Sequence, residues 1–219
     1  MGDVIMAERP VYVSTENAPY VKTENIAFQF FNGFSDVQKM RSIESLHAAF
    51  LAKNLDLRLL EISSKSAVPL GIELSAFNLQ IVLPKSGKSV SVESAFQSSK
   101  VFEGGKQFVD LLDKSSRDAK RDPRLKTSGQ LKAFKFFKHE FPLEPKTYFY
   151  DWLYINALRR QKDLTEEILN YDAFTDIEFN PKKSLNCQAK AAAIFVGLSR
   201  AGLIDDAVSN KEKFLEIVY

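Results

Sequence analysis

The sequence predicts an α+β fold in which helices dominate and the strands form a small sheet and a hairpin. Strand-like apolar runs are confined to the N-terminal part of the chain, whereas helical spacing of apolar residues prevails from residue 91 onward. No repeat, low-complexity tract or linker rich in Pro, Gly and Ser divides the 219 residues. We therefore expect an N-terminal arm over residues 1–25, lying on a single domain over residues 26–219.

The strands are expected early in the chain. The apolar and aromatic residues of 26–31 predict a first strand, and those of 57–62 predict a second. Segment 72–83, which is rich in Ile, Leu, Val and Phe, is also strand-like. The turn residues of 84–88 then reverse the chain before the apolar positions of 90–92, as in a hairpin.

The helices begin with a capped segment. Ser35, with Gln38 three residues later, fits a capping box, and apolar residues follow at helical spacing over 36–53. Further helices are predicted over 91–103, 106–114, 115–121, 128–138, 147–161, 163–170 and 185–201. Gly202 follows the last of these at the position where a helix-ending glycine is common, and 206–219 forms a final helix or strand.

The scarce residue types exclude several classes of protein. One Cys excludes an internal disulfide and a cysteine-based zinc site, two His leave little for a histidine metal centre, and nine Gly are few for a glycine-rich nucleotide loop. We expect Cys187 to be a packing residue, and His47 and His139 to have surface or structural roles. The chemistry must then come from carboxylates, amines, guanidinium groups and amides, without a metal or another cofactor.

Nothing in the sequence indicates export or a membrane. The first ten residues lack the apolar core of a secretory signal, and no stretch approaches the about 20 apolar residues of a membrane span. We therefore expect a soluble, cytoplasmic protein.

The charge is uneven along the chain, although the net charge is only +2. Segment 114–138 holds nine Lys and Arg but only two acids, Asp118 and Asp122, which gives +7. Such a segment can bind phosphates. Alternatively, its cations lie on solvated helix faces and are balanced by acids elsewhere. The sequence leaves both interpretations open.

Glu93, Gln97 and Lys100 share one face of the helix predicted over 91–103. On a regular helix the three side chains fall within about 60° of one another. Ser91 is placed to cap this helix, so that Glu93 lies in the first turn, where a carboxylate is favoured. The stripe is a solvent-facing row of polar residues or, if this face borders a cleft, a site.

Four segments in the same order resemble the NADAR family. Residues 70–78 (LGIELSAFN) and 86–102 (SGKSVSVESAFQSSKVF) are similar to its Leu-Ser-Asn-Phe segment, its Gly-Lys hairpin turn and its Glu-His-x-Phe-Gln-Ala-x-Lys-Phe core. Residues 115–121 (SSRDAKR) resemble its Ala-Lys segment. Residues 174–191 resemble its closing acidic segment and the Asn-containing helix that follows. The resemblance covers residues 60–200.

The sequence departs from the family pattern at several points. Ala76 stands where the family usually has Asn, Ser94 stands where it often has His, and the Trp-Gly pair near the end is missing. Asp176 and Glu178 compete for the acidic position. Segment 116–156 resembles a branch of antidotes paired with DarT-type toxins, which attach ADP-ribose to guanine in DNA.

The resemblance implies an N-glycosidase that removes ADP-ribose from guanine and thereby acts as antitoxin to a DarT-type ADP-ribosyltransferase. Its partners would be ADP-ribosylated guanine in DNA, with RNA or a free nucleotide as alternatives, the product ADP-ribose, and the cognate toxin. Two other functions stay open. One is cleavage of riboflavin-pathway intermediates, and the other is non-catalytic binding of single-stranded nucleic acid by cations and stacking aromatic side chains.

The resemblance also implies the catalytic residues. Glu93 matches the family's helix-start Glu, a ligand of the ribose hydroxyls or a general base, and Asp176 or Glu178 would be the second carboxylate. Lys100 matches the family's Lys, which is either a Schiff-base nucleophile or a ligand of the diphosphate.

The implied substrate-binding residues are Ser75, Phe77, Asn78, Gln97, Lys120, Arg121 and Asn186. The first three are expected at the end of a strand that faces the pocket, with Phe77 stacked on a base or packed in the core. Gln97 would bind sugar hydroxyls. Lys120 and Arg121, within the basic segment, would bind the diphosphate.

Overall fold

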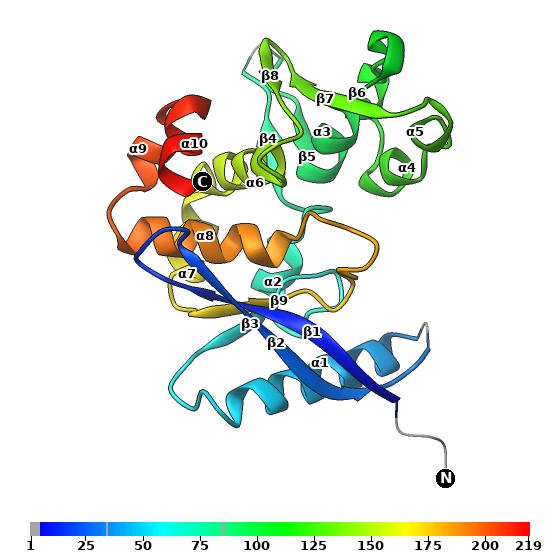
Figure 1. Ribbon diagram of the computed structural model, residues 1–219. Helices are drawn as coiled ribbons and strands as arrows, with labels where there is room; N and C mark the ends of the chain where they lie inside the picture. The colour runs from blue at the N-terminus through cyan, green and yellow to red at the C-terminus, as the bar shows by residue number, and fades with distance from the viewer. Residues whose placement is uncertain (1–4, 34, 85) are drawn as a thin grey trace.

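The computed structural model describes residues 5–33, 35–84 and 86–219. Within these residues the larger sheet has the strand order β2-β1-β9-β3 (Figure 1). β1 (Ile5–Ser14) and β2 (Val21–Phe30) form a long antiparallel hairpin. β9 (Ala173–Thr175) pairs with β1 antiparallel and with β3 (Leu59–Glu61) in parallel. The α+β fold class is confirmed, as are strands within 26–31 and 57–62.

The N-terminal arm expected over residues 1–25 has to be corrected. Residues 1–4 lie outside the described residues, but β1 is an interior strand, bonded to β2 on one side and to β9 on the other. Val11 and Tyr12 are buried in it. The first half of the strand is mostly exposed, so only part of the segment contributes to the core. Tyr12 pairs with Phe174, a long-range contact that no local pattern reveals.

α1 (Asp36–Leu51) covers one face of this sheet, below the strands in Figure 1. Its start is as predicted, because the Ser35 hydroxyl accepts a hydrogen bond of 3.4 Å from the Gln38 amide. Between α1 and the sheet lies a small core built from Val11, Ile26, Phe28, Ile43, Leu46, Phe50, Ala173 and Ile177.

α8 (Gln188–Arg200) covers the opposite face of the sheet (Figure 1). The approach is very close at Gly197, where an added Cβ would lie only 2.4 Å from the Thr15 carbonyl oxygen and 2.5 Å from that of Tyr20. A glycine is therefore needed for the β1–β2 hairpin to dock on α8. The helix ends as predicted, with Gly202 in the left-handed region at φ +72°.

The segment after β3 contains α2 (Pro69–Glu73), β4 (Gln80–Val82), β5 (Ser89–Ser91) and α3 (Val92–Ser98). β4 and β5 pair antiparallel, which confirms the predicted reversal, although Lys85 in its turn lies outside the described residues. The strand expected over 72–83 is wrong for its first part. Residues 72–79 end α2 and turn, and Tyr154 fixes them by donating a hydrogen bond of 2.8 Å to the Leu74 carbonyl.

A second sheet follows, with the order β6-β7-β8, from β6 (Lys100–Phe102), β7 (Leu131–Phe136) and β8 (His139–Phe141). Between β6 and β7 lie η1 (Glu103–Gly105), η2 (Val109–Asp113), α4 (Ser116–Arg121) and α5 (Arg124–Thr127). The helix predicted over 91–103 thus ends at Ser98.

The helix expected over 128–138 is wrong, because β7 and its turn occupy this segment. Phe134 and Phe136 both pack on Phe149, with ring centroids 4.9 and 6.5 Å away. Side chains two residues apart face the same side only in a strand. The spacing of apolar residues in this short segment fits either a helix or a strand. Packing against α6 therefore decides that the segment is a strand.

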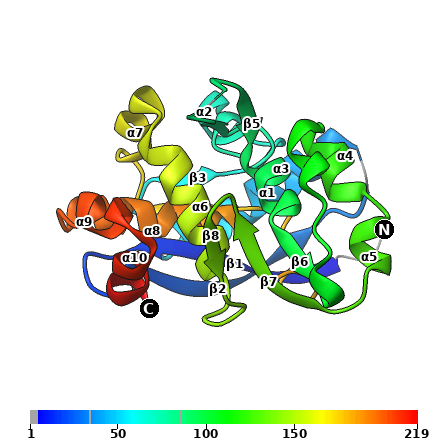
Figure 2. The same cartoon turned by 90° about the horizontal axis from the view of Figure 1, so that it is seen from above.

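The remaining helices are α6 (Tyr148–Arg159), α7 (Lys162–Ile168), α9 (Ile204–Ser209) and α10 (Lys211–Val218). The predictions over 147–161 and 163–170 are confirmed, and 206–219 is helical. Seen from above, α9 and α10 lie at one side of the molecule and α3, α4 and α5 at the other (Figure 2). Within the described ranges, no helix combines the length and apolar character needed to span a membrane.

Candidate active site

A cavity of about 800 Å³ lies between α3, the turn after α2, β7, the segment before α6 and the segment that joins β9 to α8. This volume is within the range of small-molecule sites, about 300–1,000 Å³. The predicted site residues that line it are Ser75, Phe77, Glu93, Gln97, Lys100, Lys120, Asp176, Glu178 and Asn186. Asn78 and Arg121 do not. The polar stripe on α3 therefore borders a cleft.

Glu93 is buried in the first turn of α3. The Ser91 hydroxyl caps this helix by accepting a hydrogen bond of 3.1 Å from the Ser94 backbone amide. The Glu93 backbone amide donates a hydrogen bond of 2.9 Å to the Ala76 carbonyl. The Oε1 atom of the Glu93 carboxylate accepts a hydrogen bond of 2.7 Å from the Gln97 side-chain amide. The Lys120 ammonium lies 3.7 Å from the other carboxylate oxygen, Oε2. Helix capping and these two partners fix the carboxylate at the cavity wall.

Gln97 lines the cavity and has an unsatisfied side-chain acceptor. Its nitrogen donates to Glu93, so its side-chain oxygen faces the other way. That oxygen is buried and has no hydrogen-bond partner among the described residues. A buried amide oxygen without a partner is unfavourable.

Lys100 lies on β6 and not on the helix where the sequence placed it. It still borders the cavity, because β6 pairs with β7 at Lys100 and Phe134, which also lines the cavity. Burial lowers the pKa of Lys100, Glu93 opposes this, and the positive charge of Lys120 adds to the lowering. A lowered pKa makes the neutral amine of Lys100, which is its nucleophilic form, easier to reach.

Asp176 and Glu178 both border the cavity but differ in their surroundings. Asp176 Oδ1 accepts hydrogen bonds from the Glu178 and Phe179 amides, of 3.0 and 3.1 Å. Burial, and then the nearby Glu61, raises the pKa of Asp176 well above its ordinary value. Glu178 is exposed and forms an ion pair of 2.9 Å with Lys39. Of the two acids, Asp176 is the one suited to hold a proton.

The sequence model of the DarT1-associated NADAR antitoxins matches residues 7–219. The chain belongs to this family. The match includes β1 and β2, so that the hairpin is part of the family domain. It confirms the resemblance to NADAR proteins, and with it the assignment of this chain as a DarT-associated antitoxin. No curated protein matches the chain.

Sequence reasoning missed Glu61 in this antitoxin. Glu61 ends β3 and is almost completely buried, at 3% exposure. Its carboxylate accepts a hydrogen bond of 2.6 Å from the Thr175 hydroxyl and one of 2.8 Å from the Ile177 backbone amide. The one signal in the sequence is an acid between apolar neighbours, Leu60 and Ile62, in a predicted strand. Such an acid is unusual in a buried strand.

The residues of the 75–78 turn differ in role. Ser75 and Asn78 both donate to the Ile72 carbonyl, at 2.7 and 2.9 Å, so their side chains hold the turn together. The strand end predicted for them does not exist. Phe77 faces the cavity, and the Lys120 ammonium lies 5.0 Å from its ring centroid.

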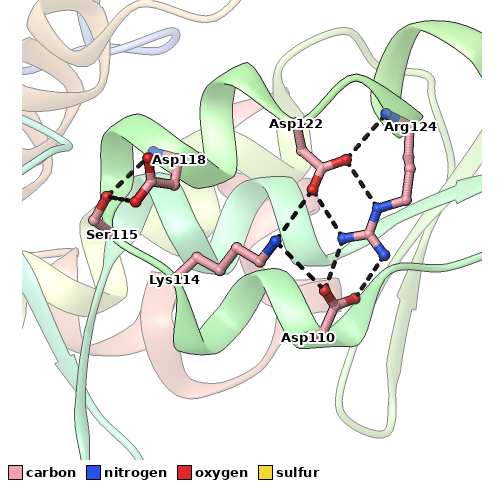
Figure 3. A network of polar contacts seen from close by, with 6 residues as sticks. All are labelled: Asp110, Lys114, Ser115, Asp118, Asp122 and Arg124. Carbon is pink, nitrogen blue, oxygen red and sulfur yellow. Dashed lines mark hydrogen bonds and ion pairs between the residues drawn. The ribbon is translucent and has the colours of Figure 1, made fainter.

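Most cations of segment 114–138 are balanced by acids. Lys114 and Arg124 meet Asp110 and Asp122, with Arg124 bonded to both carboxylates at 2.7–3.2 Å (Figure 3). The Arg124 guanidinium lowers the pKa of Asp122 far below its usual range. Of the nine cations in this segment, all of which is described, only Lys120 lines the cavity. For the ion-paired cations of the segment, the interpretation that acids elsewhere balance their charge therefore holds.

Cys187 and His47 have structural roles, as predicted. Cys187 is buried at the start of α8, and burial raises the pKa of its thiol well above the ordinary value. His47 Nε2 lies 2.8 Å from the Thr175 hydroxyl, and burial lowers its pKa to about 4. Among the described residues no group of three or more His, Cys, Asp and Glu side chains is arranged to hold a metal ion.

Proposed function

We propose that this antitoxin is an N-glycosidase that releases ADP-ribose from guanine bases of DNA. One observation carries the proposal. A buried carboxylate, Glu93, is held by Gln97 and Lys120 in a cavity that also contains the high-pKa carboxyl group of Asp176. Two carboxyl groups in one cavity, one to accept a proton and one to donate a proton, are what acid and base catalysis at a glycosidic bond requires.

The reaction breaks the bond between ribose C1 and the guanine amine nitrogen. Water adds to C1, its oxygen becomes the C1 hydroxyl, and one proton ends on the nitrogen, which restores guanine. In our proposal Glu93 accepts a proton from the attacking water and stabilises positive charge at C1, and Asp176 donates a proton to the leaving nitrogen. No electrons are transferred, so the residues of the cavity suffice.

Lys100 offers a second route through the same cavity. Its neutral amine adds to C1 of the ring-opened ribose and the guanine amine leaves, which creates an imine between Lys100 and the sugar. Water then hydrolyses this imine and frees both the lysine and ADP-ribose. The lowered pKa of Lys100 supports this route. Borohydride reduces an imine to a stable adduct, so that adduct formation by the wild type, and its absence in Lys100→Arg, distinguishes this route from direct hydrolysis.

Further cavity residues suit the rest of the substrate. The unsatisfied oxygen of Gln97 fits a ribose hydroxyl as donor, Lys120 fits the diphosphate as a point charge, and the Phe77 ring fits a base. Outside the cavity, four cations of the basic segment have no carboxylate within ion-pair distance among the described residues: Arg117, Arg121, Lys126 and Lys138. These cations are available for the phosphates of a nucleic acid, which supports DNA over a free nucleotide.

Glu93→Gln tests the proposal. It keeps the side-chain size but removes the base, so we expect the rate of ADP-ribose release from ADP-ribosylated single-stranded DNA to fall about 100-fold or more. Affinity for ADP-ribose and DNA should stay within a few-fold. Glu73→Gln, at an exposed position on α2, is the matched control. Unchanged release by Glu93→Gln would refute the carboxylate assignment.

The same assay separates the alternative functions. Wild-type protein that binds DNA without releasing ADP-ribose would be a non-catalytic binder. Faster cleavage of riboflavin-pathway glycosides than of ADP-ribosylated DNA would make it a metabolic N-glycosidase.

A further inference from the structure

The Glu61 carboxylate holds both residues that flank Asp176. One of its oxygens accepts a hydrogen bond of 2.6 Å from the Thr175 hydroxyl, and the other accepts one of 2.8 Å from the Ile177 backbone amide. Both oxygens are thus used on the two neighbours of a single cavity residue. Glu61 does not itself line the cavity, so it acts on the site from behind.

The sheet brings Glu61 to this place. β3 and β9 run parallel with Glu61 opposite Thr175, and both strands end at that pair. The first residue past the end of β9 is Asp176, which lines the cavity. Two parallel strands that are far apart in sequence therefore place a buried acid against the segment that carries a cavity acid.

A residue of α1, His47, also contacts the Thr175 hydroxyl that is bonded to Glu61. His47 Nε2 lies 2.8 Å from the Thr175 hydroxyl oxygen. The single hydroxyl proton of Thr175 is donated to Glu61, so His47 is the donor in its contact. The neutral ring is consistent with its pKa of about 4. The chain from His47 through Thr175 to Glu61 contains no unsatisfied partner.

Asp176 is left with one free oxygen. Oδ1 accepts from the Glu178 and Phe179 amides, whereas Oδ2 has no hydrogen-bond partner among the described residues. The titratable groups that influence Asp176, or are influenced by it, come from several elements and are Glu61, Glu178, Tyr12, Tyr150, Tyr154 and Cys187. Burial and the two acids among them favour the protonated carboxyl group. Burial raises the pKa of Glu61 as well, but the hydrogen bonds that it accepts from Thr175 and Ile177 oppose this and favour its charged form.

We propose that Glu61 is a positioning residue for the reaction: it fixes segment 175–177 so that Asp176 Oδ2 faces the cavity, and its negative charge keeps a proton on that oxygen. The inference rests on the proposed function for the use of this proton, which passes to the leaving guanine nitrogen. Glu61 itself touches no substrate.

Glu61→Gln removes the charge but keeps the contacts. The glutamine oxygen accepts from the Ile177 amide, and its NH₂ donates to the Thr175 oxygen. The Thr175 hydroxyl then donates to His47 Nε2 in the other neutral tautomer. Without the negative charge, Asp176 loses its proton at lower pH. We therefore expect the alkaline limb of kcat against pH to move to lower pH by about one unit, with KM within two-fold of the wild type. Glu44→Gln, an exposed site on α1, should leave the profile unchanged.

A direct titration makes the test independent of activity. We expect the carboxyl ¹³C resonance of Asp176, assigned with Asp176→Asn, to titrate at a lower pH in Glu61→Gln than in the wild type. An equal midpoint in the two proteins overturns the inference. A lowered midpoint together with a wild type that releases no ADP-ribose overturns the proposed function and leaves the positioning role intact.

If Glu61→Gln does not fold, variants of Thr175 test the positioning role of Glu61 instead. Thr175→Val removes one of the two hydrogen bonds through which Glu61 holds the segment, and Thr175→Ser keeps it. We expect kcat to fall several-fold in the valine variant with little change in KM, and to recover in the serine variant. Equal kcat values in all three proteins would contradict a positioning role.

Discussion

Gly71→Ala tests how closely α2 must approach the strand that carries Glu61. Gly71 lies inside α2, where alanine would normally be favoured over glycine by about 0.5–1 kcal/mol. In this fold, however, a Cβ at Gly71 would lie 2.0 Å from the Glu61 carbonyl oxygen and 2.4 Å from Ser66 Oγ. Ordinary carbon–oxygen contacts are near 3.3 Å. The Glu61 carbonyl would have to move by about 1.3 Å.

The magnitude follows from what must move. Overpacking against side chains typically destabilises by about 1–3 kcal/mol. Here the obstacle is the backbone of β3, which is held by its pairing with β9. We therefore expect Gly71→Ala to lower the free energy of unfolding by about 3 kcal/mol, despite the better helix propensity. Because Ser63 and Ser64 follow the displaced carbonyl in the chain and line the cavity, affinity for ADP-ribose should fall as well.

Gly202→Ala is the matched control. Gly202 has nothing within 4 Å of an added Cβ, but its φ is +72°. The expected loss there is about 1–2 kcal/mol, from backbone strain alone. Urea unfolding followed by circular dichroism measures both variants, and isothermal titration calorimetry measures ADP-ribose affinity. The reasoning is refuted if Gly71→Ala is as stable as the wild type, or less destabilised than Gly202→Ala.

Three further predictions follow from the site. Lys120→Met should weaken ADP-ribose binding about ten-fold, as expected for loss of a charged contact, whereas Arg121→Met, outside the cavity, should change it less than two-fold in the same calorimetric titration. The raised pKa of Asp176 means that its contribution to stability is present below the unfolded pKa near 3.9 and is lost as pH rises through the folded value. Asp176→Asn should therefore gain stability relative to the wild type between pH 4 and pH 8, and a constant difference in urea unfolding would contradict this. Cys187 should react with a thiol-specific disulfide reagent only after unfolding, because it is buried and its pKa is raised. Rapid labelling of the native protein would show that the start of α8 opens.

Prediction from sequence was most accurate where the pattern is local and long. The helices over 36–53 and 147–161 have repeated apolar spacing, and both exist with only small changes at their ends. It was wrong for 128–138 and for the first part of 72–83, where short apolar runs fit either a helix or a strand. The N-terminal segment was not expected to be an interior strand, because β9, the second strand that it pairs with, is far away in the chain.

The sequence by itself determined which chemical groups this protein can offer: carboxylates, amines, guanidinium groups and amides, in segments that resemble NADAR proteins. It placed Glu93 and Gln97 on one helix face, because a 3.6-residue period is a local property. Only the tertiary structure decided that this face borders a cavity and that Lys100 reaches the cavity from a strand. It also decided that Asp176 is half-buried at the cavity, whereas the exposed Glu178 pairs with Lys39. Burial and the approach of a second carboxylate such as Glu61 depend on contacts between residues distant in sequence. These long-range contacts set the proton affinities on which the proposed reaction depends, and no local pattern encodes them.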